Sequence, residues 1–202
     1  LVLKDARIVN VFTEEIIRGD IAIQDGIIAG IGSFHGKEER DLAGRYVCPG
    51  FIDSHLHLES TLVTPAELVT AASRHGTTTF IVDPHESANV SGLAGIDYIL
   101  DQTEDVKANV YVMMPSCVPA TAIDDNGCTL TAEDMVPYLH NSRILGLGEV
   151  MDSISVVQGE KSMHDKLELF EGRIRDGHAP FLEEGDLQAY AMAGIATDHE
   201  CS

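Results

Sequence analysis

The sequence predicts an α/β protein: a TIM-like (β/α)8 barrel, incomplete at about six βα units, preceded by part of a small β-sandwich. From Tyr46 onward, apolar strand-like runs alternate with helical stretches, as in the βα units of a parallel sheet. The ends of these runs lie 21 to 34 residues apart, close to the roughly 30 residues of one βαβ unit. A closed barrel needs eight strands and about 250 residues, so we expect two strands to be missing.

The first 49 residues have a different pattern and are predicted to form the small β-sandwich segment. Short β-branched runs cover residues 1–3, 6–11, 20–23 and 27–31. Asp25-Gly26 is a strong hairpin signal between the last two runs. We therefore expect a domain boundary after residue 49, with the truncated barrel at residues 50–202.

Within the barrel, six strand-like runs are separated by helices. The runs cover residues 47–57, 77–84, 110–115, 144–151, 173–178 and 194–199. Helix starts follow from capping patterns such as Thr64-Pro65, which is followed by Glu67, and Thr131, which is followed by Asp134. Each run ends in polar residues that can take part in chemistry.

Composition excludes several classes of function. The 202 residues include 13 basic and 33 acidic ones, a net charge of -20, and nucleic acid is an unsuitable partner because phosphate binding needs a basic surface. No apolar run is long enough to cross a membrane, and charges throughout the first 20 residues argue against a signal peptide. Four cysteines without a CxxC pair suit a reducing compartment, so we expect a cytoplasmic protein.

Two histidines end the first barrel strand, in the stretch PGFIDSHLH. Residues i and i+2 of a strand share one face, so His55 and His57 are expected to point the same way. Two imidazoles on one face can hold one metal ion. A bare HxH pair is weak evidence, but the apolar strand and the PGFID stretch before it favour a metal site over two unconnected histidines.

Three later strand ends carry further candidate ligands. Glu149 ends the Gly-rich run GLGE, His178 lies in DGHAP, and His199 lies in TDHE. Parallel barrel strands converge at one rim, so these side chains should meet His55 and His57 there. Four imidazoles and one carboxylate suit two metal ions sharing a bridge, which two-metal sites place roughly 3.5–4 Å apart; Glu149 is the expected bridge and the candidate catalytic residue.

Other residues at the rim allow more than one interpretation. Asp83, His85 and Glu86 follow the second strand and could bind an additional metal ion, contact substrate, or form a turn fixed by Pro84. Glu200 is a further candidate for holding a ring nitrogen of a substrate. Ser116 and Cys117 follow the third strand, where the flanking prolines favour a rigid turn over a role in lining the pocket.

The motifs together resemble the amidohydrolase superfamily. PGFIDSHLH, GLGEV, DGHAP and TDHE carry that resemblance. Within the superfamily, GTTT, DPHE, PSCVPA and DGHAP are similar to the bacterial adenine deaminases, over nearly all 202 residues.

The resemblance implies hydrolysis of adenine to hypoxanthine and ammonia. It also implies two divalent metal ions, manganese or iron, with zinc as an alternative, held by His55, His57, Glu149, His178 and His199. The family further uses an Asp on the eighth strand, which no position up to Ser202 matches, so we expect the isolated segment to be inactive.

Two rival functions remain open. One is another amidohydrolase acting on a cyclic amide or an N-acetyl group; many such enzymes bridge their metals with a carboxylated Lys, and no Lys stands at the Glu149 strand end. The other is a non-catalytic metal-binding barrel. The expected partners are adenine and water, with neither nucleic acid nor membrane, and a second copy of the chain in a homodimer or higher homo-oligomer.

Overall fold

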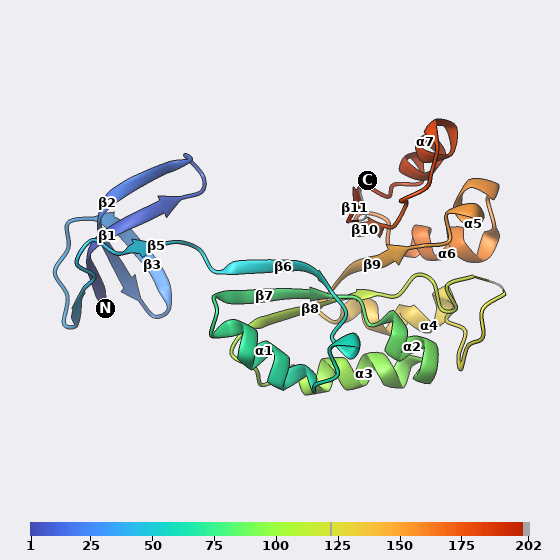
Figure 1. The fold of residues 1–202 in the computed structure, drawn as a ribbon, viewed down its shortest axis with the longest axis horizontal. Coiled ribbons are helices and arrows are strands. Elements are labelled where there is room, and N and C mark those ends of the chain that lie inside the picture. Colours follow the sequence, from blue (N-terminus) through green and yellow to red (C-terminus); the bar gives the residue numbers. More distant parts are fainter. Residues whose placement is uncertain (122, 200–202) are drawn as a thin grey trace. The chain divides into compact units, whose positions relative to one another are not determined.

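The computed structural model describes residues 1–121 and 123–199. The chain separates into two compact units, Leu1–Gly50 and Phe51–Ser202 (Figure 1). Each unit has its own sheet and its own buried cluster.

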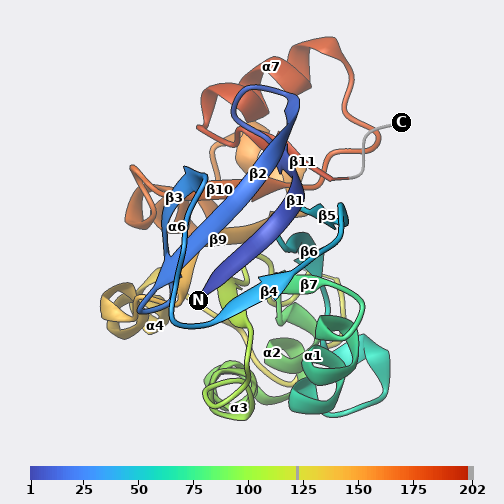
Figure 2. The ribbon, with the colours of Figure 1, turned by 90° about the vertical axis from the view of Figure 1, so that its left-hand side faces the viewer.

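The first unit is a five-stranded sheet of β1 (Val2–Asn10), β2 (Glu15–Gln24), β3 (Ile27–Gly32), β4 (Glu39–Asp41) and β5 (Tyr46–Val47). Strand β1 lies between β2, which runs antiparallel to it, and β4, which runs parallel (Figure 2). β5 also pairs with β1. The described residues of this unit form a single sheet, so the second layer of a sandwich is not among them.

Two details of this sheet relate to the sequence pattern. The predicted runs 1–3 and 6–11 belong to one strand, β1, because a register shift between Leu3 and Ala6 interrupts the pattern without ending the pairing. The Asp25-Gly26 hairpin is confirmed: both residues have positive φ, 52° and 79°, as a tight turn between β2 and β3 requires.

The second unit contains the six predicted barrel strands in sequence order. They are β6 (Phe51–Leu56), β7 (Thr77–Val82), β8 (Asn109–Met114), β9 (Ile144–Val150), β10 (Ile174–Gly177) and β11 (Thr197–Asp198). Each strand is parallel to its neighbour in the order β6 to β11. This curled parallel sheet confirms the prediction of an incomplete TIM-like barrel.

Helices connect the strands and cover the sheet. They are η1 (Glu59–Thr61), α1 (Pro65–Ser73), α2 (His85–Ser91), α3 (Leu93–Gln102), α4 (Ala132–Met135), η2 (Val136–His140), α5 (Ser153–Gln158), α6 (Lys161–Leu169) and α7 (Glu184–Met192). In Figure 1, α1, α2 and α3 lie on one side of β7 and β8. Helix α4 begins at the predicted place, where Thr131 and Asp134 form a capping box.

The core of the second unit lies between sheet and helices. Phe80, Val112 and Leu147 from the strands are buried with Ile96 of α3 and Phe170 beyond α6. Burying one such side chain stabilises the fold by about 1.5–3 kcal/mol, so this packing fixes the strands. Their carboxyl ends are therefore held in a defined arrangement.

No helix in the described ranges is both long and apolar enough to cross a membrane.

Candidate metal centre

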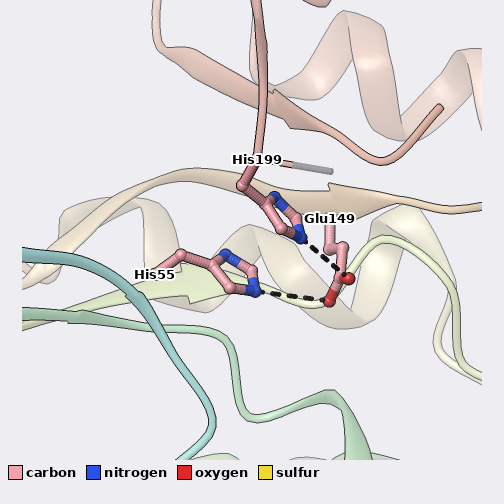
Figure 3. Close-up of side chains that lie close together, drawn as sticks. All are labelled: His55, Glu149 and His199. Carbon is pink, nitrogen blue, oxygen red and sulfur yellow. Dashed lines mark hydrogen bonds and ion pairs between the residues drawn. The ribbon is translucent and has the colours of Figure 1, made fainter. Parts of the chain in front are cut away.

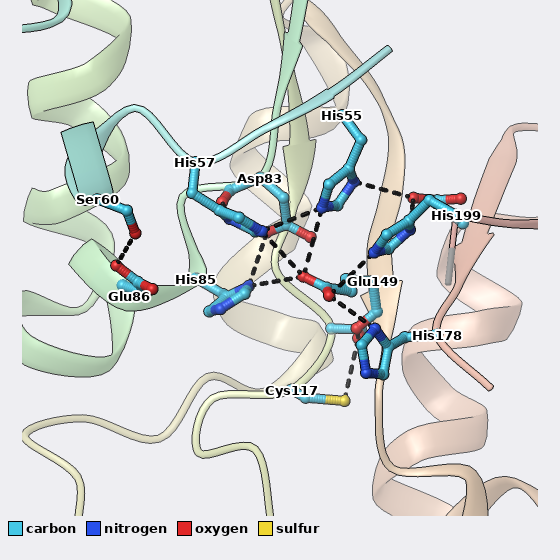
Figure 4. A network of polar contacts seen from close by, with 12 residues as sticks. His55, His57, Ser60, Asp83, His85, Glu86, Cys117, Glu149, His178 and His199 are labelled. Atoms are coloured by element: carbon cyan, nitrogen blue, oxygen red, sulfur yellow. Dashed lines mark hydrogen bonds and ion pairs between the residues drawn. The ribbon is translucent and has the colours of Figure 1, made fainter. Parts of the chain in front are cut away.

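The structure brings the five predicted ligand side chains together at the carboxyl ends of the strands (Figure 4). His55 lies on β6 and His57 directly follows it. Glu149 lies on β9, and His178 and His199 follow β10 and β11. Parallel pairing places all these strand ends at one edge of the sheet, which is why residues up to 144 positions apart in sequence become neighbours.

Buried Glu149 lies at the centre of the cluster, and its oxygen Oε2 faces one set of imidazoles. Oε2 lies 3.8 Å from Nε2 of His55 and 3.5 Å from Nε2 of His57. It also lies 3.1 Å from Nδ1 of His85. Three ring nitrogens from two strand ends thus surround a single carboxylate oxygen.

The other oxygen of Glu149, Oε1, faces a second set of imidazoles. Oε1 lies 3.0 Å from Nδ1 of His178 and 3.1 Å from Nε2 of His199 (Figures 3 and 4). A carboxylate with one oxygen toward each of two nitrogen sets has the geometry of a bridging ligand. The arrangement can therefore serve two cations at once.

Several polar atoms of the cluster lack a hydrogen-bond partner although they are buried. They include Oε2 of Glu149, both carboxyl oxygens of Asp83 and the Nδ1 atoms of His85 and His178. Buried polar atoms are nearly always satisfied, so such a concentration indicates a partner of another kind. Imidazole and carboxylate donors suit first-row divalent metals, and the residues present fit such ions.

Two groups of three residues offer ligand atoms within 4.8 Å of one another. One is His55, Glu149 and His199, and the other is His57, His85 and Glu149. Glu149 belongs to both groups. His57 is further oriented by a 2.8 Å hydrogen bond between its Nδ1 and the carbonyl oxygen of Asp83, which leaves Nε2 directed into the cluster.

The stretch Asp83 to Glu86 divides between the cluster and its surroundings (Figure 4). Buried Asp83 and half-buried His85 face the cluster, with Oδ1 of Asp83 3.8 Å from Nδ1 of His85. Glu86 is exposed and accepts a 2.5 Å hydrogen bond from the hydroxyl of Ser60. Glu200, also predicted as a site residue, lies outside the described residues.

The start of α2, which carries His85, is held by the preceding βα loop. Oε1 of Glu59 accepts hydrogen bonds from the backbone N–H groups of Glu86 and Ser87, at 3.1 and 3.3 Å. A carboxylate at a helix N-terminus satisfies amides that have no partner within the helix. Glu59 therefore fixes the helix that presents His85.

The pKa values of the two buried carboxyl groups of the cluster, Asp83 and Glu149, are shifted in opposite directions. Burial raises the pKa of Asp83 to about 7, with the charge of Glu149 adding to the effect and that of His85 opposing it. Burial also raises the pKa of Glu149, but the close contact with His85 and the charges of His85, His57 and His55 outweigh burial and lower the pKa to about 2. Glu149 is thus the anionic centre of the cluster.

Two supporting residues, Lys166 and Asp176, escaped the sequence analysis, and a third, Ser116, was predicted only to lie in a rigid turn. The hydroxyl of Ser116 donates to the carbonyl oxygen of Glu149 at 2.8 Å, and Nζ of buried Lys166 donates to the carbonyl oxygen of Ser116 at 2.6 Å. Asp176 lies beside His55 and His199. The D-x-H spacing of Asp176 and His178 could have signalled Asp176, because residues at this spacing share one strand face. The sequence carried no comparable signal for Lys166, which lies on helix α6.

A curled parallel sheet with a histidine–carboxylate cluster at its strand ends defines the class of metal-binding α/β barrels. Within that class, the chain belongs to the Amidohydrolase family, whose model matches residues 46–202. The family is metal-dependent, and the histidine and glutamate groups described above are candidate ligands.

Curated relatives cover the whole chain. It is 61% identical over 201 residues to an adenine deaminase of Desulfitobacterium hafniense, and 50% identical over 204 residues to an adenine deaminase of Clostridium acetobutylicum. In both cases the match covers 100% of this chain but only 35% and 36% of the relative. The chain thus spans about a third of the length of these proteins.

Solved structures share the fold at low sequence identity. A dihydroorotase matches with a TM-score of 0.56 and 18% identity, over 93% of this chain and 54% of that one. N-isopropylammelide isopropylaminohydrolase from Burkholderia multivorans matches with a TM-score of 0.56 and 15% identity, over 97% and 67%. These likenesses support the incomplete barrel and carry no information on substrate.

Proposed function

We propose that the protein deaminates adenine hydrolytically to hypoxanthine and ammonia at a centre of two divalent cations. The observation that carries the two-cation part is the position of Glu149, whose two oxygens face separate sets of imidazoles. The choice of adenine is supported by the relatives named adenine deaminase, at 61% and 50% identity.

His55, His57, Glu149, His178 and His199 would hold the two cations. Glu149 would contribute from the middle of the cluster, with His55 and His57 near its oxygen Oε2 and His178 and His199 near its oxygen Oε1. When bound, the cations supply positive charge that lowers the pKa of a coordinated water to about 7. We propose manganese or iron as the resident metal; the same donors accept zinc.

The reaction replaces nitrogen by oxygen at one carbon of the base. Water oxygen bonds to C6 of adenine and the C6–N bond breaks; one water proton goes to the amino nitrogen, which leaves as ammonia, and the other stays on the hypoxanthine product. Glu149 remains an anion and holds the centre together, so it does not carry that proton. Transfer falls to another carboxylate near the centre, which the family resemblance assigns to an Asp beyond the positions of this chain.

A recess beside His85 offers room for the base. It has a volume of about 450 Å³, within the roughly 300–1,000 Å³ typical of small-molecule sites. Its walls include both polar and apolar side chains, among them His85, Asn89, Cys117, Ala120 and Met151. We propose that the planar base enters here, with His85 and Asp83 as substrate-contacting residues or as ligands of an additional cation.

Ammonia release from adenine by the Mn²⁺-loaded full-length protein tests the function. We expect release with adenine and none with a cyclic amide or an N-acetyl substrate. His178→Asn should abolish it, whereas His140→Asn, at an exposed histidine of η2, should leave it unchanged. Turnover of the cyclic amide would favour the other amidohydrolase activity, and bound metal without any turnover would favour a non-catalytic barrel.

We further propose that the protein acts in the cytoplasm as a homodimer or higher homo-oligomer. Free Cys48, Cys117 and Cys128, the cysteines of the described residues, support a reducing compartment. Sedimentation of the purified protein tests the oligomeric state, and a monomer at micromolar concentration would contradict it.

A further inference from the structure

We infer that Asp176 is a positioning residue that orients two of the candidate metal ligands, His55 and His199. The inference rests on the proposed metal centre. Asp176 lies on β10, where it pairs in register with Thr197 of the neighbouring strand β11. Its side chain is 16% exposed and lies beside the rings of His55 and His199.

One oxygen of Asp176 serves both histidines. Oδ2 lies 3.4 Å from Nδ1 of His55 and 3.3 Å from Nδ1 of His199. The other oxygen, Oδ1, accepts a 2.6 Å hydrogen bond from the hydroxyl of Thr197. The carboxylate is therefore anchored on its far side while its near side faces two ring nitrogens.

The two rings are arranged as a pair. Their centroids lie 3.6 Å apart with an interplanar angle of 16°, so they are stacked. In both rings Nδ1 faces Asp176 and Nε2 faces Glu149, at 3.8 Å for His55 and 3.1 Å for His199. The two carboxylates thus lie at opposite ends of the same stacked pair.

This arrangement determines which nitrogen of each ring is available as a ligand. A carboxylate that accepts from Nδ1–H keeps the proton on Nδ1 and leaves the Nε2 lone pair free. His57 is oriented in the same way by the carbonyl oxygen of Asp83. Asp176 supplies the equivalent acceptor for two ligands at once, one from each end of the sheet.

Asp176→Asn tests the inference, because it keeps the size but replaces one acceptor oxygen by an NH₂ group. The control is Asp186→Asn, at an exposed position of α7. We expect Mn²⁺ affinity, measured by titration calorimetry, to fall by roughly 10- to 100-fold in Asp176→Asn and to stay unchanged in the control. The visible spectrum of the Co²⁺-loaded protein should also change, because the ligand rings are no longer held in place.

Wild-type Mn²⁺ affinity and an unchanged Co²⁺ spectrum in Asp176→Asn would overturn the inference. If that variant does not fold, Thr197→Val provides the test. A smaller loss of Mn²⁺ affinity together with a changed Co²⁺ spectrum supports the inference. Wild-type affinity and a wild-type spectrum overturn it. Different results test the proposed function. Wild-type protein that binds Mn²⁺ but releases no ammonia from adenine removes the deaminase proposal and leaves the role of Asp176 intact, whereas wild-type protein that binds no cation removes both.

Discussion

At Gly148, the absence of a side chain makes room for a carboxylate of the cluster. A Cβ added there would overlap Oδ2 of Asp83 and lie 3.1 Å from Cβ of Met113. The GLGE motif therefore does more than provide Glu149. Its second glycine allows the ends of β7 and β9, which flank β8 in the sheet, to hold two carboxyl groups close together.

We predict that Gly148→Ala destabilises the protein by about 1–3 kcal/mol, the usual cost of overpacking a well-packed interior, and displaces Asp83. Denaturant unfolding measures the first effect. Gly185→Ala is the matched control, since nothing lies within 4 Å of its added Cβ and alanine favours its helix, α7. Equal stability of Gly148→Ala and wild type would contradict the account.

The candidate ligand residues could be predicted individually because each stands at the end of a strand-like run. His55, Glu149 and His178 needed only the rule that parallel strands end at one edge. The sequence could not show that His85 faces Glu149 while Glu86 turns outward, since that depends on how Glu59 holds the start of α2. The D-x-H spacing could have pointed to Asp176 itself, but its contact with His199 depends on the register of β10 with β11, which the sequence does not show.

Among the elements, helix α7 connects two of the strand ends through Tyr190. Its buried hydroxyl accepts a 3.0 Å hydrogen bond from the backbone N–H of His178 and donates a 2.6 Å bond to the carbonyl oxygen of Val150. These groups adjoin a register shift between β9 and β10, where the ladder is irregular. Tyr190 thus supports the backbone next to Glu149 and at His178.

Tyr190→Phe is predicted to cost about 1–3 kcal/mol, because it leaves the part-buried N–H of His178 and the buried C=O of Val150 without their partner. Thermal unfolding of the variant against wild type measures the loss. Tyr98→Phe on α3, whose side chain is exposed, should change stability by less than about 0.5 kcal/mol. Comparable stability of the two variants would argue against the role of Tyr190.

The small sheet has its own polar anchor at Asp20. This carboxylate accepts hydrogen bonds from Nζ of Lys4 at 2.5 Å, from the backbone N–H of Phe34 at 3.1 Å and from that of Asp5 at 3.0 Å. Asp5 lies in the register shift of β1. The sequence predicted two separate runs here, because local patterning does not reveal a side chain from β2 that holds the irregularity together.

These contacts, the bond from Lys4 foremost, lower the pKa of Asp20 from 3.8 to about 2. A depressed folded-state pKa contributes stability above the unfolded value that is lost as the pH falls through the folded one. We predict that the small sheet loses stability between about pH 4 and pH 2. Circular dichroism across this pH range measures the loss. Asp20→Asn should remove this dependence, and an unchanged acid transition in the variant would contradict the assignment.

For the whole molecule, the proposed metal centre predicts a coupling between metal binding and folding. Five or six ligand side chains converge from strands spread over the second unit, so a cation that binds them stabilises the folded state. At a free concentration of 100 times its Kd, such a ligand adds about 2.7 kcal/mol. For a chain of this size that corresponds to a rise in Tm of roughly 5–11 °C.

Chelation is therefore predicted to lower the Tm of the Mn²⁺-loaded protein by a similar amount, and added Mn²⁺ should restore it. Differential scanning calorimetry measures the shift. Ca²⁺ is the control cation, because it prefers oxygen ligands and should restore little. A Tm indifferent to chelator would show that the cluster is not occupied.

At this scale the fold could be predicted from the alternation of strands and helices in the sequence. The observed strand order, β6 to β11, agrees with that prediction. The chemistry depends on a finer feature, the separate surroundings of the two oxygens of Glu149. Metal content by mass spectrometry, in wild type and in Glu149→Gln loaded with Mn²⁺, tests this feature most directly. We predict two ions per chain in the wild type and at most one in the variant. A single ion in the wild type, or two ions retained in Glu149→Gln, would contradict the bridging role.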